Sequence, residues 1–161
     1  MSKNFVTSRT IRKASIEDIP RIAEILVFSK RKNYRHIFND DIGSFVELQV
    51  CRIAQEYTDK PGALDGIFVY DDVFVKGFIH IDDSEIKELY IDPFFERKGI
   101  GGELIKFAKS NFNCSKLWVL AKNENAKKFY KRNGFHETEE VRIVPEVHDS
   151  DVLEIKMVRD I

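Results

Sequence analysis

The residues best suited to chemistry lie in the run EIKELYIDPFFERKGIGG, at positions 85–102. Bulky and β-branched residues over 86–91 favour a strand, and Asp92-Pro93 ends it because proline has no N–H to donate. A glycine-rich segment at 99–102 then leads into an apolar pattern typical of a helix. The run is therefore predicted to form a strand, a sharp turn and a helix that begins with glycines.

A helix that begins this way can bind phosphate, because its first N–H groups lack partners and lie at the positive end of the helix dipole. Gly99, Gly101 and Gly102 carry no Cβ atom that would keep a phosphate from the backbone, and Arg97 and Lys98 add positive charge. Neither the G-x-x-x-x-G-K-[ST] loop nor the complete G-x-G-x-x-G fingerprint is present. The alternative is a strand-to-helix turn that binds no ligand.

This segment and a second motif together resemble the GNAT superfamily of acyl-CoA N-acyltransferases. The sequence ERKGIGG is similar to the [QR]-x-x-G-x-[GA] motif of that family, with Glu96 where Gln or Arg is usual. The family's N-x-x-A-x-x-[FL]-Y-x-x-x-G-F segment is matched by Asn123, Ala126, Phe129, Tyr130, Gly134 and Phe135. Since a carboxylate at Glu96 offers nothing to a phosphate, that contact would fall to Arg97, Lys98 and the backbone.

The resemblance implies one GNAT-like domain over residues 1–161. Its fold class would be α/β, of the α+β kind with a mixed sheet. We expect a central mixed sheet of six to seven strands, mostly antiparallel with one splayed parallel pair, flanked by about four helices. Residue patterns place strands near 10–13, 67–70, 73–81, 86–92, 116–121, 135–144 and 152–158. They place helices near 16–30, from 40 or 41 to about 54, and over 101–111 and 125–133. We expect a loop or short helix at 31–39, a hairpin connection at 71–72 and a polar link at 145–150.

The resemblance also implies the cosubstrate, which is acetyl-CoA. The glycine turn would hold the pyrophosphate, Asn123 would contact the pantetheine arm, and backbone groups of the splayed strand would pair with that arm. The implied cofactor-binding residues are Leu89, Ile91, Arg97, Lys98, Gly99, Ile100, Gly101, Gly102 and Asn123. The reaction implied is acetyl transfer to a primary amine of a small cationic molecule or peptide.

Direct attack by an amine requires a base for the amine and an acid for the leaving thiolate. Tyr130 is the acid candidate, since a phenol with a pKa near 10 is protonated at neutral pH. For the base, the family resemblance favours Glu85 narrowly over Glu88; the two differ in strand parity and face opposite sides unless the strand bulges. His80 and a water chain remain alternatives.

The chain has the length of a single domain, and its charge is segregated by segment. Net charge is −1, which argues against non-specific binding to nucleic acid or to a membrane. Residues 40–92 hold 4 Lys and Arg against 13 Asp and Glu, whereas residues 93–133 hold 10 against 3. The basic segment would suit a polyanionic cofactor and the acidic one a cationic amine.

Composition also limits the compartment and the other sites. No apolar run approaches the roughly 20 residues of a membrane-spanning helix, and the first residues lack the apolar core of a signal peptide. We therefore expect a cytoplasmic protein without membrane partners. Cys51 and Cys114 form no metal-binding pattern and are expected to be reduced, mostly buried thiols.

Two other functions compete with catalysis. A catalytically silent CoA-binding sensor or interaction module would bind the cofactor without turnover, and a phosphate-loop nucleotide binder would prefer ATP to CoA. The strand pair near the C-terminus also leaves an edge at which a homodimer could form.

Overall fold

The computed structural model describes residues 9–144 and 152–161, so the link expected at 145–150 lies outside the described residues. The strands are β1 (Thr10–Lys13), β2 (Ile67–Asp72), β3 (Phe74–Asp82), β4 (Glu85–Ile91), β5 (Lys116–Leu120), β6 (His136–Ile143) and β7 (Leu153–Val158). The helices are α1 (Ile19–Phe38), α2 (Val50–Asp59), α3 (Ile100–Phe112) and α4 (Glu124–Arg132). Three short helical segments accompany them, η1 (Ile16–Asp18), η2 (Gly43–Glu47) and η3 (Pro93–Phe95).

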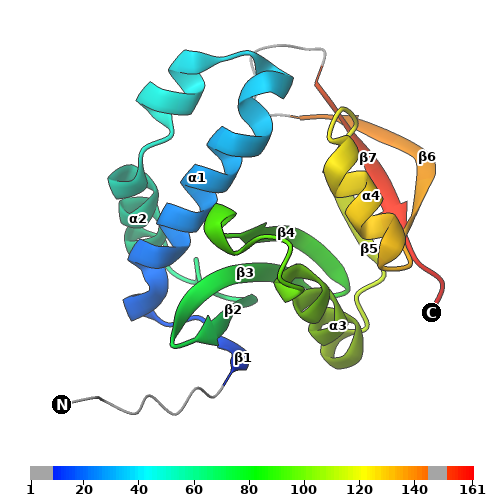
Figure 1. The fold of residues 1–161 in the computed structure, drawn as a ribbon, viewed down its shortest axis with the longest axis horizontal. Coiled ribbons are helices and arrows are strands. Elements are labelled where there is room, and N and C mark those ends of the chain that lie inside the picture. Colours follow the sequence, from blue (N-terminus) through cyan, green and yellow to red (C-terminus); the bar gives the residue numbers. More distant parts are fainter. Residues whose placement is uncertain (1–8, 145–151) are drawn as a thin grey trace.

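All seven strands join one sheet in the order β1-β2-β3-β4-β5-β7-β6 (Figure 1). Neighbouring strands are antiparallel except β4 and β5, which are parallel and pair at only two positions, Glu85 with Lys116 and Ile86 with Leu117. The predicted mixed sheet with one splayed parallel pair is confirmed. The sheet is thus divided into two parts that diverge beyond Ile86.

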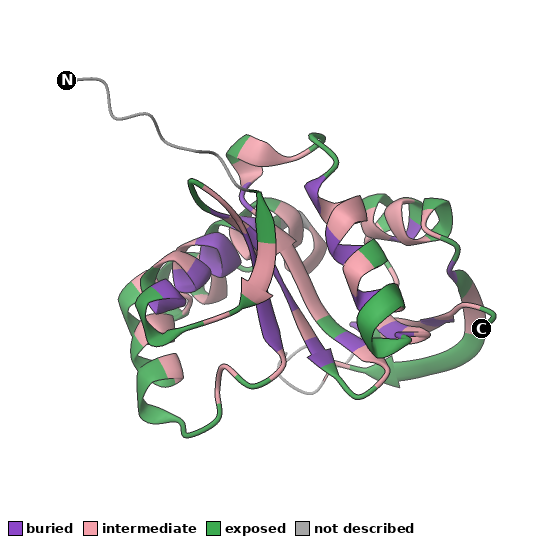
Figure 2. Cartoon of the chain, turned by 90° about the horizontal axis from the view of Figure 1, so that it is seen from below, coloured by how far each residue is buried: buried purple, intermediate pink, exposed green. Residues whose placement is uncertain are grey.

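Hydrophobic side chains cover both faces of the sheet. Ile67 and Val69 of β2 pack with α1 and α2, whereas Phe68 and Tyr70 pack with α3. These four consecutive residues are all buried, as expected for a strand covered on both faces. Figure 2 shows the buried residues concentrated along the central strands and the inner sides of the helices. We refer below to the α1 face and the α3 face of the sheet.

The chain enters α1 through a charged cap. Ser15 donates its backbone N–H to the Asp18 carboxylate at 2.8 Å, and the two residues form a capping box. The guanidinium of Arg12, on β1, donates two hydrogen bonds to the same carboxylate, at 2.8 and 2.9 Å. Because Asp18 is buried and its negative charge is matched by this fork, the start of α1 is fixed against the first strand.

The helices of the first half differ from the prediction. The separate loop or short helix expected at 31–39 is wrong, because α1 continues without a break to Phe38. The single helix expected from 40 or 41 to about 54 is also wrong, since π-helical η2 and α2 are separated at Leu48 and Gln49. The hairpin predicted at 71–72 turns one residue later, at Val73, whose φ is 71°. The first two differences lie in the region that forms the cavity described below.

Candidate active site

The turn between β4 and α3 is anchored at Asp92. Its carboxylate accepts the N–H of Phe94 at 2.8 Å and pairs with Arg21 of α1 at 2.5 Å. Asp92 is buried, so this ion pair holds the end of β4 against α1. The polypeptide can then reverse direction through η3 and reach the first turn of α3.

The glycines at the start of α3 serve different purposes. Gly99 has a φ of +85°, a conformation that residues with a Cβ rarely adopt, and a Cβ atom there would meet nothing within 4 Å. At Gly101 a Cβ would lie 3.0 Å from the Phe129 ring of α4, so this glycine allows the two helices to pack closely. The first amides of α3 are therefore next to open space at Gly99, as a phosphate site requires.

Charged side chains surround this turn. Arg97 and Lys98 are exposed, and the Lys98 ammonium lies 4.9 Å from the centre of the Phe95 ring. Glu96, the departure from the family motif, pairs with Lys32 of α1 at 2.5 Å. Because Lys32 offsets the negative charge of Glu96, the cations at Arg97 and Lys98 remain the local excess.

Backbone groups of β4 are available where the two strands diverge. Asp92 donates its N–H to Lys76 of β3 at 2.9 Å, and alternation along the ladder then turns the backbone of Leu89 and Ile91 away from β3. At this level the β4–β5 ladder has already ended. The Ile91 carbonyl accepts from the Ser29 hydroxyl at 3.0 Å. The N–H groups of Leu89 and Ile91 thus face the gap between β4 and β5.

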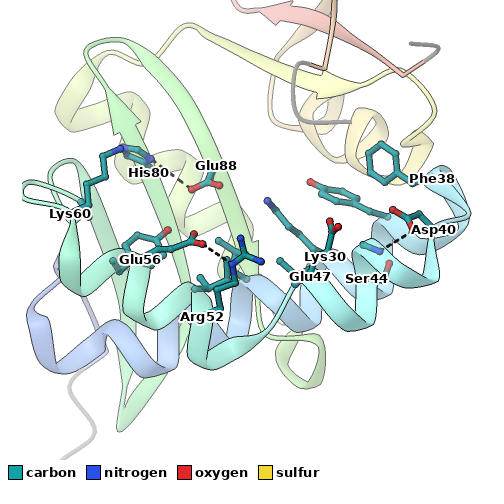
Figure 3. Close-up of a pocket in the computed structure, with 17 residues that line it drawn as sticks. Lys30, Phe38, Asp40, Ser44, Glu47, Arg52, Glu56, Lys60, His80 and Glu88 are labelled. Atoms are coloured by element: carbon teal, nitrogen blue, oxygen red, sulfur yellow. Dashed lines mark hydrogen bonds and ion pairs between the residues drawn. The ribbon is translucent and has the colours of Figure 1, made fainter. Parts of the chain in front are cut away.

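A cavity of about 960 Å³ lies on the α1 face of the sheet, between α1, η2, α2 and strands β3 and β4 (Figure 3). Its charged, imidazole and aromatic lining residues are Lys30, Tyr34, Phe38, Asp40, Glu47, Arg52, Glu56, Tyr57, Lys60, His80 and Glu88. Arg52 and Glu56 pair with each other at 3.3 Å. Mixed charge and several aromatic rings make this cavity suitable for a polar organic ligand rather than an apolar one.

A bulge in β4 decides how the two candidate bases are placed. His80 of β3 pairs with Glu88, but the next residue of β3 pairs with Ile86, so Lys87 is an extra residue on β4. Ile86 and Leu89 consequently pack in the same core on the α3 face. Glu85 and Glu88, which precede them, therefore both turn toward the α1 face.

Only one of these two carboxylates reaches the cavity. Glu88 lines it and lies 3.7 Å from Nδ1 of His80, as Figure 3 shows. Glu85 is not among the residues that line this cavity, and its carboxylate pairs with Lys87 at 3.0 Å. His80, the third base candidate, thus lies beside Glu88.

Three tyrosines gather where α1, β4 and α4 approach one another. The hydroxyls of Tyr34 and Tyr90 are 3.3 Å apart, and the Tyr130 phenol is close enough to interact electrostatically with both. The Tyr130 ring also packs against Phe129 and Phe135, with centroids 5.2 and 6.1 Å away. Burial raises the pKa of all three phenols. Tyr130 is therefore a protonated donor at neutral pH.

Asn123 lies at the start of α4, where its side-chain oxygen accepts the N–H of Ala126 at 3.1 Å. This bond orients the amide and leaves its NH₂ group to donate elsewhere. The structure thus gathers the glycine turn and the backbone of Leu89 and Ile91 along one side of β4. On the other side it places Glu88 in the cavity.

Sequence reasoning missed Tyr34 and the other cavity residues of α1. Leu26, Lys30, Tyr34 and Phe38 follow one another at intervals of four, which puts them on one side of a helix. That spacing was the available signal. It could be read only by extending the first helix through its charged second half.

A family model for the acetyltransferase (GNAT) domain matches residues 63–137, which include the β4–α3 turn and α4. The chain belongs to the GNAT superfamily. The family resemblance inferred from the two motifs is thereby confirmed. The two curated relatives described next are both named as N-acetyltransferases.

Two curated relatives support this assignment. An uncharacterized N-acetyltransferase of Methanocaldococcus jannaschii is 30% identical over 159 residues, covering 86% of this chain and 66% of the relative. A spermidine N(1)-acetyltransferase of Thermoplasma acidophilum is 29% identical over 140 residues, covering 78% of this chain and 86% of the relative. The GNAT chain thus spans about two thirds of the first relative and most of the second.

Solved structures show the same fold. The solution structure of apo YjaB from Escherichia coli gives a TM-score of 0.74 at 22% identity, covering 94% of this chain and 97% of that one. The PaiA N-acetyltransferase of Thermoplasma acidophilum, solved in complex with coenzyme A, gives 0.63 at 24% identity and covers 92% and 98%. The likeness extends over nearly the whole length of each chain.

Residues 9–144 and 152–161 lack two other kinds of feature. Within these residues no helix is long and apolar enough to cross a membrane. Their His, Cys, Asp and Glu side chains also form no group of three or more that could hold a metal ion. Of the two cysteines, Cys114 is buried as expected, whereas Cys51 is exposed on α2, contrary to the expectation that both would be mostly buried.

Proposed function

We propose that this GNAT protein transfers the acetyl group of acetyl-CoA to a primary amine of a small cationic molecule. One observation carries the proposal: β4 borders both a candidate donor site and a candidate acceptor site. The backbone of Leu89 and Ile91 faces the gap beside the glycine turn, while Glu88 of the same strand lines the cavity. An acyl group held along β4 would therefore lie next to an amine bound in that cavity.

The donor site fits a CoA thioester. The amides that open α3 and the cations Arg97 and Lys98 suit the pyrophosphate, with Ile100, Gly101 and Gly102 forming the first turn. The N–H groups of Leu89 and Ile91 can pair with the amide-containing arm in the manner of an added strand. The NH₂ group of Asn123 is oriented to donate to the same arm. The coenzyme A bound to the PaiA structure supports this choice of donor.

The acceptor site fits a cation. The Glu88 carboxylate shares the cavity with the rings of Tyr34 and Tyr57, and a carboxylate flanked by aromatic faces attracts an ammonium group. Burial is the main cause that raises the pKa of both phenols, and the negative charge of Glu88 raises it further. The spermidine substrate named for the Thermoplasma relative is a small amine of this kind. A short peptide with a free amino terminus is a second acceptor of the same chemistry.

The groups present divide the reaction between them. Glu88 would accept a proton from the ammonium, and the neutral nitrogen would attack the thioester carbonyl carbon to form the new C–N bond. The N–H of Leu89 or Ile91 would stabilise the oxyanion that develops. As the C–S bond breaks, the Tyr130 hydroxyl would supply a proton to the departing thiolate, and the second proton that leaves the amine nitrogen would pass to the resulting Tyr130 phenolate. We assign Glu88 rather than Glu85 as base because Glu88 lines the cavity.

The proposal is tested by following CoA-thiol release from acetyl-CoA with polyamines, monoamines, amino acids and short peptides, with an amine-free blank to subtract hydrolysis. Amine-dependent release is the expected result. Calorimetric binding of acetyl-CoA without release on any amine would favour the alternative function, a CoA-binding sensor. Tighter binding of ATP than of CoA would refute both.

A further inference from the structure

The outer wall of the cavity is a short irregular segment between α1 and α2. Within residues 40–48, a range that includes η2, five residues line the cavity: Asp40, Gly43, Ser44, Glu47 and Leu48. None of the residues of η2 is buried. The large apolar side chains Ile42, Phe45 and Val46 are exposed, so little apolar burial holds this segment in place. Its position must depend on other contacts.

Arg31 of α1 supplies such contacts. Its Nε donates to the carbonyl of Ser44 and its Nη2 to the carbonyl of Leu48, both at 2.8 Å. The guanidinium also lies 5.3 Å from the centre of the Phe45 ring. One planar group thus fastens both ends of the η2 turn to α1, which a single-point cation could not do.

We propose that Arg31 is a positioning residue that holds the 40–48 segment in place as the acceptor-binding wall and thereby sets affinity for the amine. This inference rests on the acceptor site proposed above. Arg31 does not line the cavity, so its effect on the acceptor passes through the backbone it holds. The groups proposed to hold the donor, the backbone of Leu89 and Ile91 and the β4–α3 turn, are not among these contacts of Arg31.

Arg35, one turn later on α1, is a matched control. It contacts the same segment through an ion pair with the Asp41 side chain at 2.6 Å, in which both partners are more than half exposed, and through the Phe45 ring, whose centre is 5.4 Å away. An exposed side-chain pair of this kind contributes little to stability and leaves the backbone carbonyls untouched. Removal of Arg35 should therefore change acceptor binding much less than removal of Arg31.

The test compares the full-length wild type with Arg31→Ala, Arg31→Lys and Arg35→Ala, using the best amine from the release assay. We expect Arg31→Ala to raise the acceptor KM about tenfold, because two charge-assisted hydrogen bonds are lost. The KM for acetyl-CoA should stay within about twofold. Arg31→Lys, which keeps the charge but not the two-way fork, should fall between Arg31→Ala and the wild type.

Hydrogen exchange of the unliganded protein gives a second readout that needs no substrate. We expect amides within 43–48 to exchange at least about tenfold faster in Arg31→Ala and at nearly the wild-type rate in Arg35→Ala. Unchanged exchange in this segment would overturn the inference, as would a parallel rise in the KM for both substrates. If the wild type shows no amine-dependent turnover, the proposed function fails and the role of Arg31 in acceptor affinity fails with it. The exchange result would still decide whether Arg31 holds the segment.

Discussion

Replacing Glu88 by Gln tests which carboxylate acts on the amine. Glutamine keeps the size of the side chain but removes the negative charge and the ability to accept the amine proton. The variant should fold normally, since within the described residues the carboxylate of Glu88 lies no closer than 3.7 Å to Nδ1 of His80 and no short ion pair is broken. Loss of a general base typically lowers the rate by about 10² to 10⁴. We therefore expect kcat/KM to fall at least about 100-fold, or about 2.7 kcal/mol of transition-state stabilisation.

The assay is steady-state CoA-thiol release with the best amine, and Glu85→Gln is the matched control on the same strand. Its carboxylate pairs with Lys87 outside the cavity lining, so its kcat/KM should change less than about threefold. Acetyl-CoA binding, measured by calorimetry, should be unaffected in both variants. The reasoning would be refuted if Glu88→Gln kept the wild-type kcat/KM while Glu85→Gln lost about 100-fold in kcat/KM.

Three further predictions concern other residues. Tyr130→Phe should lower kcat about tenfold or more. Because burial raises the pKa of Tyr130, the ratio of the variant's kcat to the wild-type kcat should stay constant from about pH 6 to about pH 9. A ratio that changes with pH would contradict this. Asp18→Asn should lower the free energy of unfolding by about 2 kcal/mol at neutral pH. Arg12 lowers the pKa of Asp18, so this stabilisation is complete above the pKa of the unfolded state, about 3.9, and is lost as pH falls through the pKa of the folded state. The free energies of unfolding of the wild type and Asp18→Asn, measured by denaturant melts, should therefore converge in acid. A difference that stays constant with pH would contradict the pairing. A thiol reagent at about pH 8 should label Cys51 but not Cys114 in the native protein, because Cys114 is buried and its pKa is raised to about 11; native labelling of both would contradict the packing.

The second half of the fold could be predicted because local signals there agree with one another. The strand before Asp92, the glycines before α3 and the cap at Asn123 each mark a boundary that the structure retains within one or two residues. Gly134, the motif glycine that follows α4, has a positive φ of 87°. Long-range packing did not override these local choices.

The first half could not be predicted in the same way. Residues 31–39 are rich in charged and polar side chains, yet α1 continues through them because Arg31 and Tyr34 find partners on η2 and β4. Such contacts are made between distant parts of the chain and leave no periodic apolar pattern in the sequence. The break at Leu48 and Gln49 likewise depends on tertiary contacts, one of them the bond from Arg31 to the Leu48 carbonyl.

The placement of the candidate base depended on a single extra residue. The sequence pattern alone puts Glu85 and Glu88 on opposite sides of a regular strand, whereas the bulge at Lys87 turns both toward the α1 face. No residue type within 85–91 predicts a bulge. The choice between the two carboxylates therefore required the register between β3 and β4.

The most direct test of the proposed reaction is to follow the acetyl group itself. Acetyl-CoA labelled with a heavy isotope in its acetyl group would be incubated with the protein and the best amine, and both amine and protein would be examined by mass spectrometry. Direct transfer along β4 predicts labelled acetyl on the amine and none on the protein. An unlabelled amine, or label retained on the protein at a cysteine, would contradict it.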